Sequence, residues 1–369
     1  MHIAARYPPG LGGMEKVVQS LARHQHQLGM QVRVLTSDHG RTDLPEEDES
    51  FPVSRLKSIY IAHTPIIPSL LPRLLGLDRR TIIHLHVSCA YIPEIVWLYA
   101  KLRGHRYVAH VHLDVPPSGR AGSLLVPYKR FLLRPVLRAA EVVLVPTPDY
   151  REIISGRYQI PPDRIVVMGN ATEHRIAPRP KSLAREAAER RLLFVGRLAA
   201  QKNIPLMLEA VAAYAAKYDR AIRLSIVGDG ELRSATRSLI DRLALRDIVT
   251  LRGPLHGDGL QSAYEEADLL LLTSTDESYG LVFIEAMTKG VPIVSVNIPA
   301  VRNVVASGVN GLLAEPAPEA VADAIHALLA DGEFYAEISG NNLAKARSLD
   351  WGAIASDLAR VYDRLHISA

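Results

Sequence analysis

The stretch Leu269–Met287 reads LLLLTSTDESYGLVFIEAM. Its opening run of leucines is short and wholly apolar, which is typical of a strand buried on both faces of a parallel sheet. A polar turn follows Thr273, and a helix is predicted to begin near Gly280. This pattern predicts a strand–turn–helix unit of an open α/β sheet, and such sheets bind ligands outside the carboxyl ends of their strands. The turn is therefore the first candidate for a binding site.

The same alternation of apolar runs and amphipathic segments fills the rest of the chain in two series. The first series predicts strands at Val32–Thr36, Ile82–His86, Val108–His112, Val142–Pro146 and Ile165–Met168, with helices at Glu15–Leu28 and Tyr128–Ala140. The second predicts strands at Leu192–Val195, Leu224–Val227, Val249–Leu251, Leu269–Leu272, Ile293–Val296 and Leu312–Ala314, with helices at Pro205–Lys217, Glu231–Leu243, Leu281–Thr288 and Pro318–Ala330. Because right-handed βαβ crossovers wind each series into a parallel sheet, we predict an α/β protein with two Rossmann-like, doubly wound domains.

We place the first domain at residues 1–175 and the second at residues 176–350. Between the two series, the segment Glu173–Arg191 carries prolines and many charges but no strand pattern, so it is predicted to link the domains. Residues 351–369 are predicted to add an amphipathic helix that packs back on the first domain. The two sheets are expected to face a central cleft with their carboxyl ends.

Composition excludes several classes of protein. The formal net charge of +4, from 43 basic and 39 acidic residues, is small and spread along the chain, and no basic stripe with interleaved aromatic residues predicts a nucleic-acid partner. Cys89 is the single cysteine, which excludes an internal disulfide and suits a reducing compartment. The first residues lack the apolar core of a signal peptide, and prolines interrupt the apolar stretch Ile59–Leu77. We therefore expect a cytoplasmic protein without a transmembrane helix.

The turn in the quoted stretch combines a helix start with two glutamates. Backbone N–H groups at Gly280, Leu281 and Val282, together with the positive end of the helix dipole, would form an anion site. Glu277 precedes that helix and Glu285 lies inside it. A carboxylate beside an anion site is explained if it accepts the hydroxyl protons of a sugar diol. The alternative is a capped, solvated helix whose glutamates lie on the surface.

A second candidate follows the predicted strand that ends at Val195. Gly196 is followed by Arg197 and, five positions later, by Lys202. Arginine offers a planar fork for phosphate and lysine a compact point charge, so the two could neutralise a departing diphosphate without a metal. Taken alone, basic residues in such a loop are more often solvated.

The first series contains candidates at two places. Gly12 and Gly13 join the first strand to the first helix, where glycine permits close approach of the backbone to a ligand. A dinucleotide fingerprint would need a further glycine where Glu15 stands, which argues against a nicotinamide enzyme. His112 lies at the carboxyl end of a strand and could contact a sugar hydroxyl or share a proton, with Asp114 either orienting it or capping the loop. No cluster shows metal-ligand spacing, so no metal site is predicted.

Together these residues resemble glycosyltransferase family 4, and the resemblance covers nearly the whole chain. The matching motifs, each weak alone but specific in this order and spacing, are Gly12–Glu15, His112–Asp114, Val195–Leu198 with Lys202 and Asn203, Gly228–Gly230, the pair Glu277 and Glu285, Gly290–Val294 and Gly308–Leu312. The resemblance implies the GT-B fold, with an acceptor-side N-terminal domain and a C-terminal domain that binds a nucleotide sugar.

The resemblance also implies a role for the matching positions in the second domain. Glu285 would bind the ribose diol of the donor, and Glu277 would hold hydroxyls of the transferred sugar. Arg197 and Lys202 would bind the diphosphate, and the donor-binding set is completed by Gly196 and by the backbone of Gly280, Leu281 and Val282.

In the first domain, the resemblance places His112 against the sugar near its reacting centre, and Gly12 and Gly13 at the floor of the cleft. Members of this family retain the anomeric configuration by same-face attack, in which the leaving phosphate accepts the acceptor's proton, and generally need no bound metal. We therefore predict a metal-independent hexosyltransferase without a cofactor, a nucleotide diphosphate sugar being its substrate. Its predicted catalytic residues are His112, Glu277, Arg197 and Lys202. Two positions depart from the family pattern, Asn303 in place of a glutamate and Ala171 in place of a glycine.

Several alternatives stay open at this point. A non-catalytic subunit that binds a sugar nucleotide or glycan, and a phosphorylase-like or epimerase-like relative, would share the fold. The acceptor could be a glycan, a lipid-linked saccharide or a small natural product, and the loops Asp38–Val53, His63–Leu77 and Val115–Val126 are expected to select it. The basic segment Tyr128–Arg138 suggests peripheral contact with the inner face of a membrane, the alternative being an ordinary packed helix.

Overall fold

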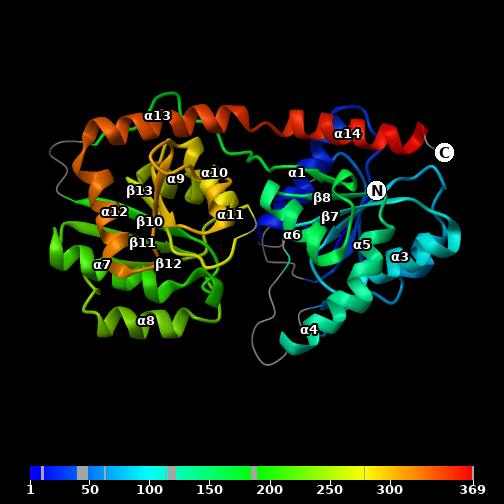
Figure 1. Ribbon diagram of the computed structural model, residues 1–369, viewed down its shortest axis with the longest axis horizontal. Helices are drawn as coiled ribbons and strands as arrows, with labels where there is room; N and C mark the ends of the chain where they lie inside the picture. The colour runs from blue at the N-terminus through cyan, green and yellow to red at the C-terminus, as the bar shows by residue number, and fades with distance from the viewer. Residues whose placement is uncertain are drawn as a thin grey trace. The chain divides into compact units, whose positions relative to one another are not determined.

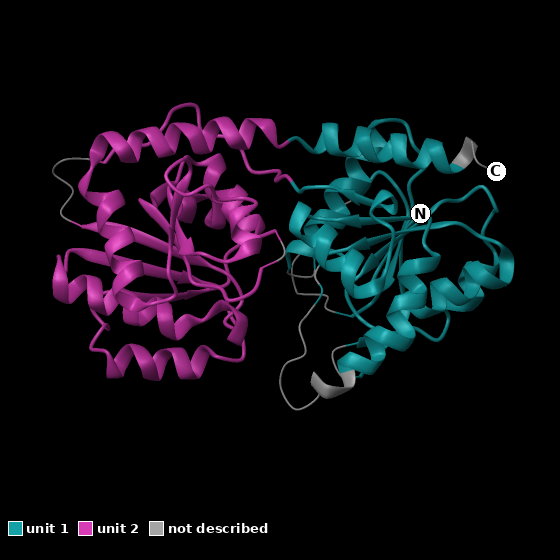
Figure 2. Ribbon diagram, in the orientation of Figure 1, with its two compact units in different colours: residues 1–170, 350–369 teal, residues 171–349 magenta. Residues whose placement is uncertain are grey.

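The computed structural model describes residues 1–9, 12–39, 49–61, 64–112, 114, 122–183, 189–277 and 279–367. The chain divides into two compact units, unit 1 (Met1–Asn170 with Asp350–Ala369) and unit 2 (Ala171–Leu349), shown in Figure 2. Each unit is built on its own parallel sheet and has its own apolar core. The prediction of two Rossmann-like α/β domains is therefore confirmed.

The sheet of unit 1 has the strand order β3-β2-β1-β6-β7-β8-β9, and all its neighbours are parallel. Its strands are β1 (His2–Ala4), β2 (Val34–Ser37), β3 (Val53–Leu56), β6 (Ile83–Val87), β7 (Tyr107–Val111), β8 (Val142–Val145) and β9 (Ile165–Val167). The direction of winding reverses between β1 and β6, which makes this the topological switch point where such sheets bind ligands. A short antiparallel hairpin, β4 (Ile59–Ile61) and β5 (Thr64–Ile66), stands apart from the sheet.

Helices cover the unit 1 sheet and include the last segment of the chain. They are α1 (Gly13–Gln27), α2 (Leu70–Leu75), α3 (Ile92–Arg103), α4 (Gly122–Tyr128), α5 (Arg134–Ala139), α6 (Pro148–Tyr158), a 3-10 turn at Pro162–Arg164 and α14 (Trp351–Ile367). In Figure 1, α14 runs beside α1, and the contacts between these helices make α14 part of unit 1.

The segment predicted as one helix over Tyr128–Ala140 is more complex in the structure. A π-helical turn, Lys129–Leu133, joins α4 to α5. Pro127 and Pro135 flank this turn. Since proline cannot donate a backbone hydrogen bond, it disturbs the regular helical ladder, and a π turn is one way in which a helix continues past such a site.

The sheet of unit 2 has the strand order β12-β11-β10-β13-β14-β15, with its switch point between β10 and β13. Its strands are β10 (Arg190–Val195), β11 (Ile222–Val227), β12 (Val249–Gly253), β13 (Leu269–Leu272), β14 (Ile293–Val296) and β15 (Gly311–Ala314). All four leucines of β13 are buried, as the apolar run predicts. The strand and helix predictions of the quoted stretch are both confirmed, because β13 and the helix at Leu281–Thr288 have the expected bounds.

Figure 1 shows α7, α8 and α12 on one side of the unit 2 sheet and α9, α10 and α13 on the other, as expected for a doubly wound fold. The helices of unit 2 are α7 (Ile204–Lys217), α8 (Arg233–Arg242), α9 (Gly257–Glu266), α10 (Leu281–Thr288), α11 (Pro299–Arg302), α12 (Pro318–Ala330) and α13 (Gly332–Ser348). The sequence pattern did not predict α9, whose first turn contains Gly257 and Gly259, or α13, whose buried face includes the polar Ser339 and Asn342. Both features weaken the apolar periodicity that marks a helix.

Much of the segment predicted as a linker, Glu173–Arg191, packs on unit 2. The backbone N–H of Ala177 donates to the carbonyl of Thr288 at 2.7 Å, and Nζ of Lys181 donates to the carbonyl of Ala267 at 2.6 Å. Arg190 and Arg191 already belong to β10. Residues 184–188 lie outside the described residues. Charged side chains and prolines concealed this packing in the sequence, because several of these contacts are made by backbone groups and the Lys181 ammonium and not by an apolar pattern.

Candidate active site

The loop after β10 and the turn after β13 meet at the switch point of unit 2. The backbone N–H of Thr275 donates to the carbonyl of Gln201 at 2.8 Å, and Oγ1 of Thr273 donates to the carbonyl of Asn203 at 3.0 Å. Lys202 ends a single 3-10 turn, Ala200–Lys202, just before α7. These bonds bring the two motifs that the sequence places far apart to one edge of the sheet.

At this edge Lys202 and Glu277 form a mostly buried ion pair. Nζ of Lys202 donates to Oε1 of Glu277, and Oγ of Ser274 donates to the same oxygen at 2.8 Å. The side chains of Lys202 and Glu277 are only 15% and 9% exposed. In the free protein the two charges therefore neutralise each other at the carboxyl edge of the sheet.

Arg197 lies in a different environment from Lys202. Its side chain is 65% exposed, and Nη2 lies 3.2 Å from Oε2 of Glu231, which is itself 53% exposed. Exposed ion pairs of this kind stabilise a protein little, since solvent screens the charges. The structure thus pairs Arg197 with Glu231, not with Glu277, and leaves its guanidinium on the surface.

The loop that carries Arg197 is held by the Gly228–Gly230 turn. A Cβ atom on Gly228 would lie 1.9 Å from the carbonyl oxygen of Gly196, and one on Gly230 would lie 2.4 Å from that of Leu198. The N–H of Leu198 donates to the carbonyl of Asp229 at 2.9 Å. Glycine is therefore required at both positions of the turn, because two backbone segments touch there.

Helix α10 begins at a left-handed residue that also calls for glycine. Gly280 has φ +67°, and a Cβ atom there would lie 2.5 Å from the ring of Phe283. The first N–H groups of an α-helix, here those of Leu281 and Val282, lack intrahelical acceptors, and the helix dipole places partial positive charge at this end. The predicted anion site thus coincides with the start of a real helix.

Glu285 lies inside α10 and is 4% exposed. Oη of Tyr264, from α9, donates to its Oε2 at 2.7 Å, and Nε2 of His174 lies 3.7 Å from its Oε1. Burial and the neighbouring carboxylate raise the pKa of Tyr264 well above its ordinary value, so its hydroxyl remains a donor. The surface-glutamate alternative is therefore wrong for Glu285. Tyr264 and His174 were not among the predicted site residues, because Tyr264 lies on a helix that the sequence pattern did not predict and His174 lies in the segment predicted as a linker.

In unit 1 the structure places His112 directly after β7, at the carboxyl edge of that sheet, where it is 8% exposed. Burial lowers the pKa of His112 to about 3, so the imidazole is neutral at physiological pH. Asp114 does not orient it. The Asp114 carboxylate instead accepts from Arg157, from Lys129 at 2.5 Å and from Oη of Tyr158 at 2.9 Å, which ties the loop after β7 to neighbouring helices.

Gly12 and Gly13 lie at the start of α1, Gly12 being the residue before the helix. A Cβ atom on Gly12 would lie 2.2 Å from Oε2 of Glu15, so the Glu15 carboxyl folds back over this glycine. Burial raises the pKa of Glu15. The residue that breaks the dinucleotide fingerprint therefore occupies the space beside the helix start with its own side chain.

The two departures from the family pattern have local explanations. Nδ2 of Asn303 donates to the carbonyl of Pro299 at 3.1 Å, so Asn303 caps the short helix α11. Ala171 is 1% exposed, and its methyl group packs in the interior.

Comparison with known proteins agrees with this architecture. Residues 12–171 match the family described as Glycosyl transferase 4-like domain, and residues 177–344 match Glycosyl transferases group 1. A D-inositol 3-phosphate glycosyltransferase of Corynebacterium glutamicum is 27% identical over 98% of this chain and 95% of its own. A GDP-mannose:cellobiosyl-diphosphopolyprenol alpha-mannosyltransferase of Komagataeibacter xylinus is 26% identical over 99% of this chain and 93% of its own.

Solved structures show the same fold. Sucrose-phosphate synthase from Thermosynechococcus elongatus superposes with a TM-score of 0.76 at 21% identity, covering 100% of this chain and 99% of that one. Anabaena HepE in complex with UDP and glucose superposes with a TM-score of 0.76 at 18% identity, covering 98% of each chain. With both units matched by glycosyltransferase families and relatives aligned over nearly the whole length, the chain belongs to glycosyltransferase family 4, the GT-B glycosyltransferases that use nucleotide-sugar donors.

Proposed function

We propose that this glycosyltransferase moves a hexose from a nucleotide diphosphate donor, held by unit 2, to an acceptor hydroxyl and retains the anomeric configuration. The observation that carries the proposal is the geometry of α10. Its free N–H groups lie at one end, and the buried Glu285 lies four residues further along. At 1.5 Å per residue the span is about 6 Å, comparable to that between the pyrophosphate and the ribose diol of a nucleoside diphosphate.

In this proposal the donor is bound from one end to the other by a continuous set of groups. Glu285, held by Tyr264, accepts the ribose hydroxyl protons. The N–H groups of Leu281 and Val282, with Lys202 and Arg197, bind the diphosphate. Arg197 is exposed and weakly paired, so it is free to turn from Glu231 to a phosphate.

The proposed reaction makes the diphosphate the group that needs stabilisation. The bond from the anomeric carbon to the phosphate oxygen breaks, and the acceptor oxygen bonds to the same face of that carbon. The acceptor's proton passes to the leaving phosphate. Lys202 and Arg197 stabilise the developing negative charge, so no metal is invoked. When Lys202 turns to the phosphate, the Glu277 carboxylate is released to accept hydroxyl protons of the transferred sugar, which His112 is proposed to contact as well.

The acceptor is proposed to be a hydroxyl of a glycan, a lipid-linked saccharide or a small natural product. Relatives at 26–27% identity are named for transfer to inositol 3-phosphate and to a diphosphopolyprenol-linked saccharide. These names support a hydroxyl acceptor and support catalysis over a role as a non-catalytic subunit. The loops expected to select the acceptor include residues 40–48, 63 and 115–121, which lie outside the described residues.

We propose a cytoplasmic location with peripheral contact at the inner face of a membrane. Within the part of the chain that the structure describes, no helix is long and apolar enough to cross a bilayer. Val126, Phe131 and Leu132 are 55%, 66% and 51% exposed and lie beside the exposed Arg130, which is the composition of an interfacial surface. Lys129 is buried against Asp114 and does not belong to this surface.

A thermal-shift screen tests the donor assignment. Purified protein is heated with UDP-, GDP-, ADP- and dTDP-sugars, and a bound donor raises the melting temperature by mass action. A donor identified in this way is then supplied with candidate acceptors, and release of nucleoside diphosphate together with a glycosidic product is measured. Stabilisation by a donor that is equal in wild type and in Glu285→Gln protein would contradict the proposed ribose site.

A further inference from the structure

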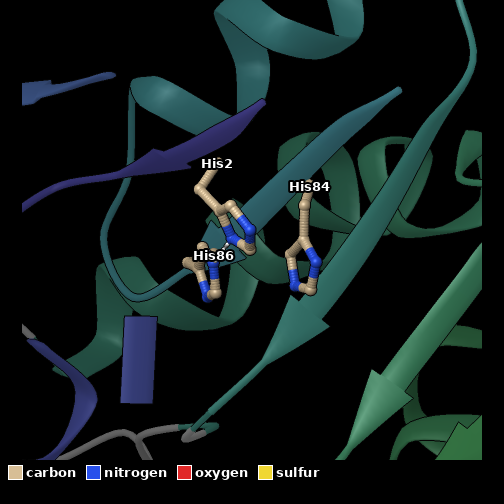
Figure 3. A group of neighbouring side chains, drawn as sticks. All are labelled: His2, His84 and His86. Carbon is tan, nitrogen blue, oxygen red and sulfur yellow. Dashed lines mark hydrogen bonds between the residues drawn. The ribbon is translucent and has the colours of Figure 1, made fainter. Parts of the chain in front are cut away.

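One face of the unit 1 sheet carries a cluster of histidines from neighbouring strands. His2 lies on β1, and His84 and His86 lie on β6. His110 lies on β7, and His112 directly follows that strand. Residues two positions apart point to the same face of a strand, and the register sets His2 beside His84 and His86 beside His110. All of these side chains are buried. Figure 3 shows His2, His84 and His86 with the hydrogen bond that joins His2 to His86.

A continuous chain of hydrogen bonds leads from His112 into this cluster. Nε2 of His112 lies 2.8 Å from Nδ1 of His86, and Nε2 of His86 lies 2.9 Å from Nδ1 of His2. Nε2 of His2 then lies 2.7 Å from Oε1 of Gln25, on α1. Every link joins one ring nitrogen to a single partner, so the chain has a direction.

The direction follows from the charge state of the rings and from the Gln25 amide. Burial lowers the pKa of His2 to about 3 and the pKa of His86 well below its ordinary value, so each ring is neutral and carries one N–H. The amide oxygen of Gln25 can only accept, so His2 must donate from Nε2 and accept at Nδ1. His86 then donates from Nε2 and accepts at Nδ1, and His112 donates from Nε2.

Tyr362, on α14, holds the Gln25 amide in this orientation. Nε2 of Gln25 donates to Oη of Tyr362 at 3.4 Å, and Oη lies 2.5 Å from Nδ1 of His84. Because the Tyr362 oxygen accepts from Gln25, its own proton is left for Nδ1 of His84. The last helix of the chain therefore contributes to the hydrogen-bond order of the cluster.

We propose that Gln25, His2 and His86 are positioning residues that hold His112 as the Nε2–H tautomer. In this state the Nδ1 lone pair of His112 is left to accept a hydroxyl proton of the bound sugar, and within the described residues Nδ1 has no other partner. The catalytic part of the inference rests on the proposed function. A tautomer fixed in advance removes the cost of selecting it when the sugar binds.

A metal site is the competing use of such a cluster. The ligand atoms of His2, His84 and His86 lie within 4.8 Å of one another, as do those of His86, His110 and His112. In the first group, however, every ring nitrogen is already hydrogen-bonded: His2 to His86 and Gln25, His86 to His2 and His112, and His84 to Tyr362 and, at 3.2 Å, His110. A metal ion would displace these bonds.

Nitrogen NMR of full-length protein labelled with ¹⁵N-histidine tests the tautomer directly. After treatment with a chelator, His2, His86 and His112 should each show the shifts of a neutral Nε2–H ring, with the His112 signal assigned by its loss in His112→Asn protein. Nδ1–H rings would mean that the chain runs the other way, and would overturn the proposal. Charged rings would also overturn the proposal. Histidine shifts that change when the chelator is added would show a bound metal and would overturn it as well.

Kinetics of Gln25→Met protein test the consequence. Methionine fills the space of glutamine but cannot accept the His2 proton, so the His112 ring should become a mixture of tautomers and kcat should fall about fivefold, the effect of one hydrogen bond. Stabilisation by the nucleoside diphosphate alone, which binds unit 2, should not change. Tyr99→Phe is the control. It removes a 3.3 Å contact with His105, which lies outside the hydrogen-bond chain from His112 to Gln25, and it should keep wild-type kcat.

A Gln25→Met protein with mixed tautomers and unchanged kcat would overturn the catalytic role. Failure of the proposed function looks different: wild-type protein would transfer no sugar from any donor, while the tautomer of His112 would still be as described.

Discussion

Replacing Lys202 with methionine removes one member of the buried Lys202–Glu277 pair. Among the described residues, the Ser274 hydroxyl is then the remaining donor to the Glu277 carboxylate, whose side chain is 9% exposed. Breaking a buried pair in this way destabilises a protein by about 3 kcal/mol. For a unit the size of Ala171–Leu349, that corresponds to a fall in melting temperature of about 6–12 °C. The expected result of Lys202→Met is therefore a folded but less stable unit 2.

The double variant Lys202→Met/Glu277→Gln separates stability from function. The glutamine amide still accepts from Ser274, and no charge is buried, so most of the lost stability should return, to within about 1 kcal/mol of wild type. Activity should not return. Loss of the cation at the diphosphate should lower kcat by about 10²-fold or more in both proteins.

Calorimetry measures the change in melting temperature, and turnover at saturating donor measures the change in kcat. A third measurement is the affinity for nucleoside diphosphate without the sugar. Lys202→Met should weaken that binding, whereas Glu277→Gln should weaken it little, because Glu277 is assigned to the sugar. Lys217→Met, in the exposed Lys217–Asp323 pair, is the matched control and should change neither stability nor turnover measurably. Near-normal turnover by the double variant would refute the diphosphate role of Lys202. An unchanged melting temperature for Lys202→Met would refute the buried pair.

Further predictions concern the other elements of the site and of unit 1. Glu285→Gln should weaken nucleoside diphosphate binding about tenfold or more, since the amide replaces one acceptor oxygen of the carboxylate with an NH₂ donor. Calorimetric titration should show this while the melting temperature of the free protein stays close to wild type. Gly228→Ala should destabilise unit 2 because the new Cβ would meet the Gly196 carbonyl, whereas a Cβ on Gly259 meets nothing within 4 Å and Gly259→Ala should not destabilise it. Urea unfolding compares the two variants, and equal unfolding midpoints would contradict the packing of Gly228 against Gly196. Unit 1 should lose stability as the pH falls below about 6.5, because the pKa values of His2 and His112 are about 3 in the folded state and near 6.5 in the unfolded chain. The unfolded chain then binds more protons, and the free energy of unfolding should fall by about 1.4 kcal/mol per pH unit for each of these histidines. Urea midpoints that are equal at pH 7 and pH 5 would rule this out. Phe131→Ser/Leu132→Ser protein should float less with anionic liposomes than wild type, and equal flotation would end the membrane proposal.

The sequence alone was enough to predict the fold and to name candidate residues for the site. Buried parallel strands need short apolar runs, so β13 and β14 could be recognised by composition, and α10 and α12 by helical spacing after a glycine or proline start. Backbone requirements also leave a mark on the sequence. Gly280 stands where φ is positive, and Gly228 and Gly230 stand where another segment of backbone touches the turn.

Which groups contact one another was decided only by the tertiary structure. The pairing of Lys202 with Glu277, the support of Glu285 by Tyr264 and the salt bridges of Asp114 join residues distant in sequence. Neither apolar periodicity nor a short motif carries information about such contacts, because both describe one element at a time. The histidine chain from His112 to Gln25 depends on strand register and on the packing of α1 and α14 against the sheet, and these arise only when hydrophobic burial brings the elements together.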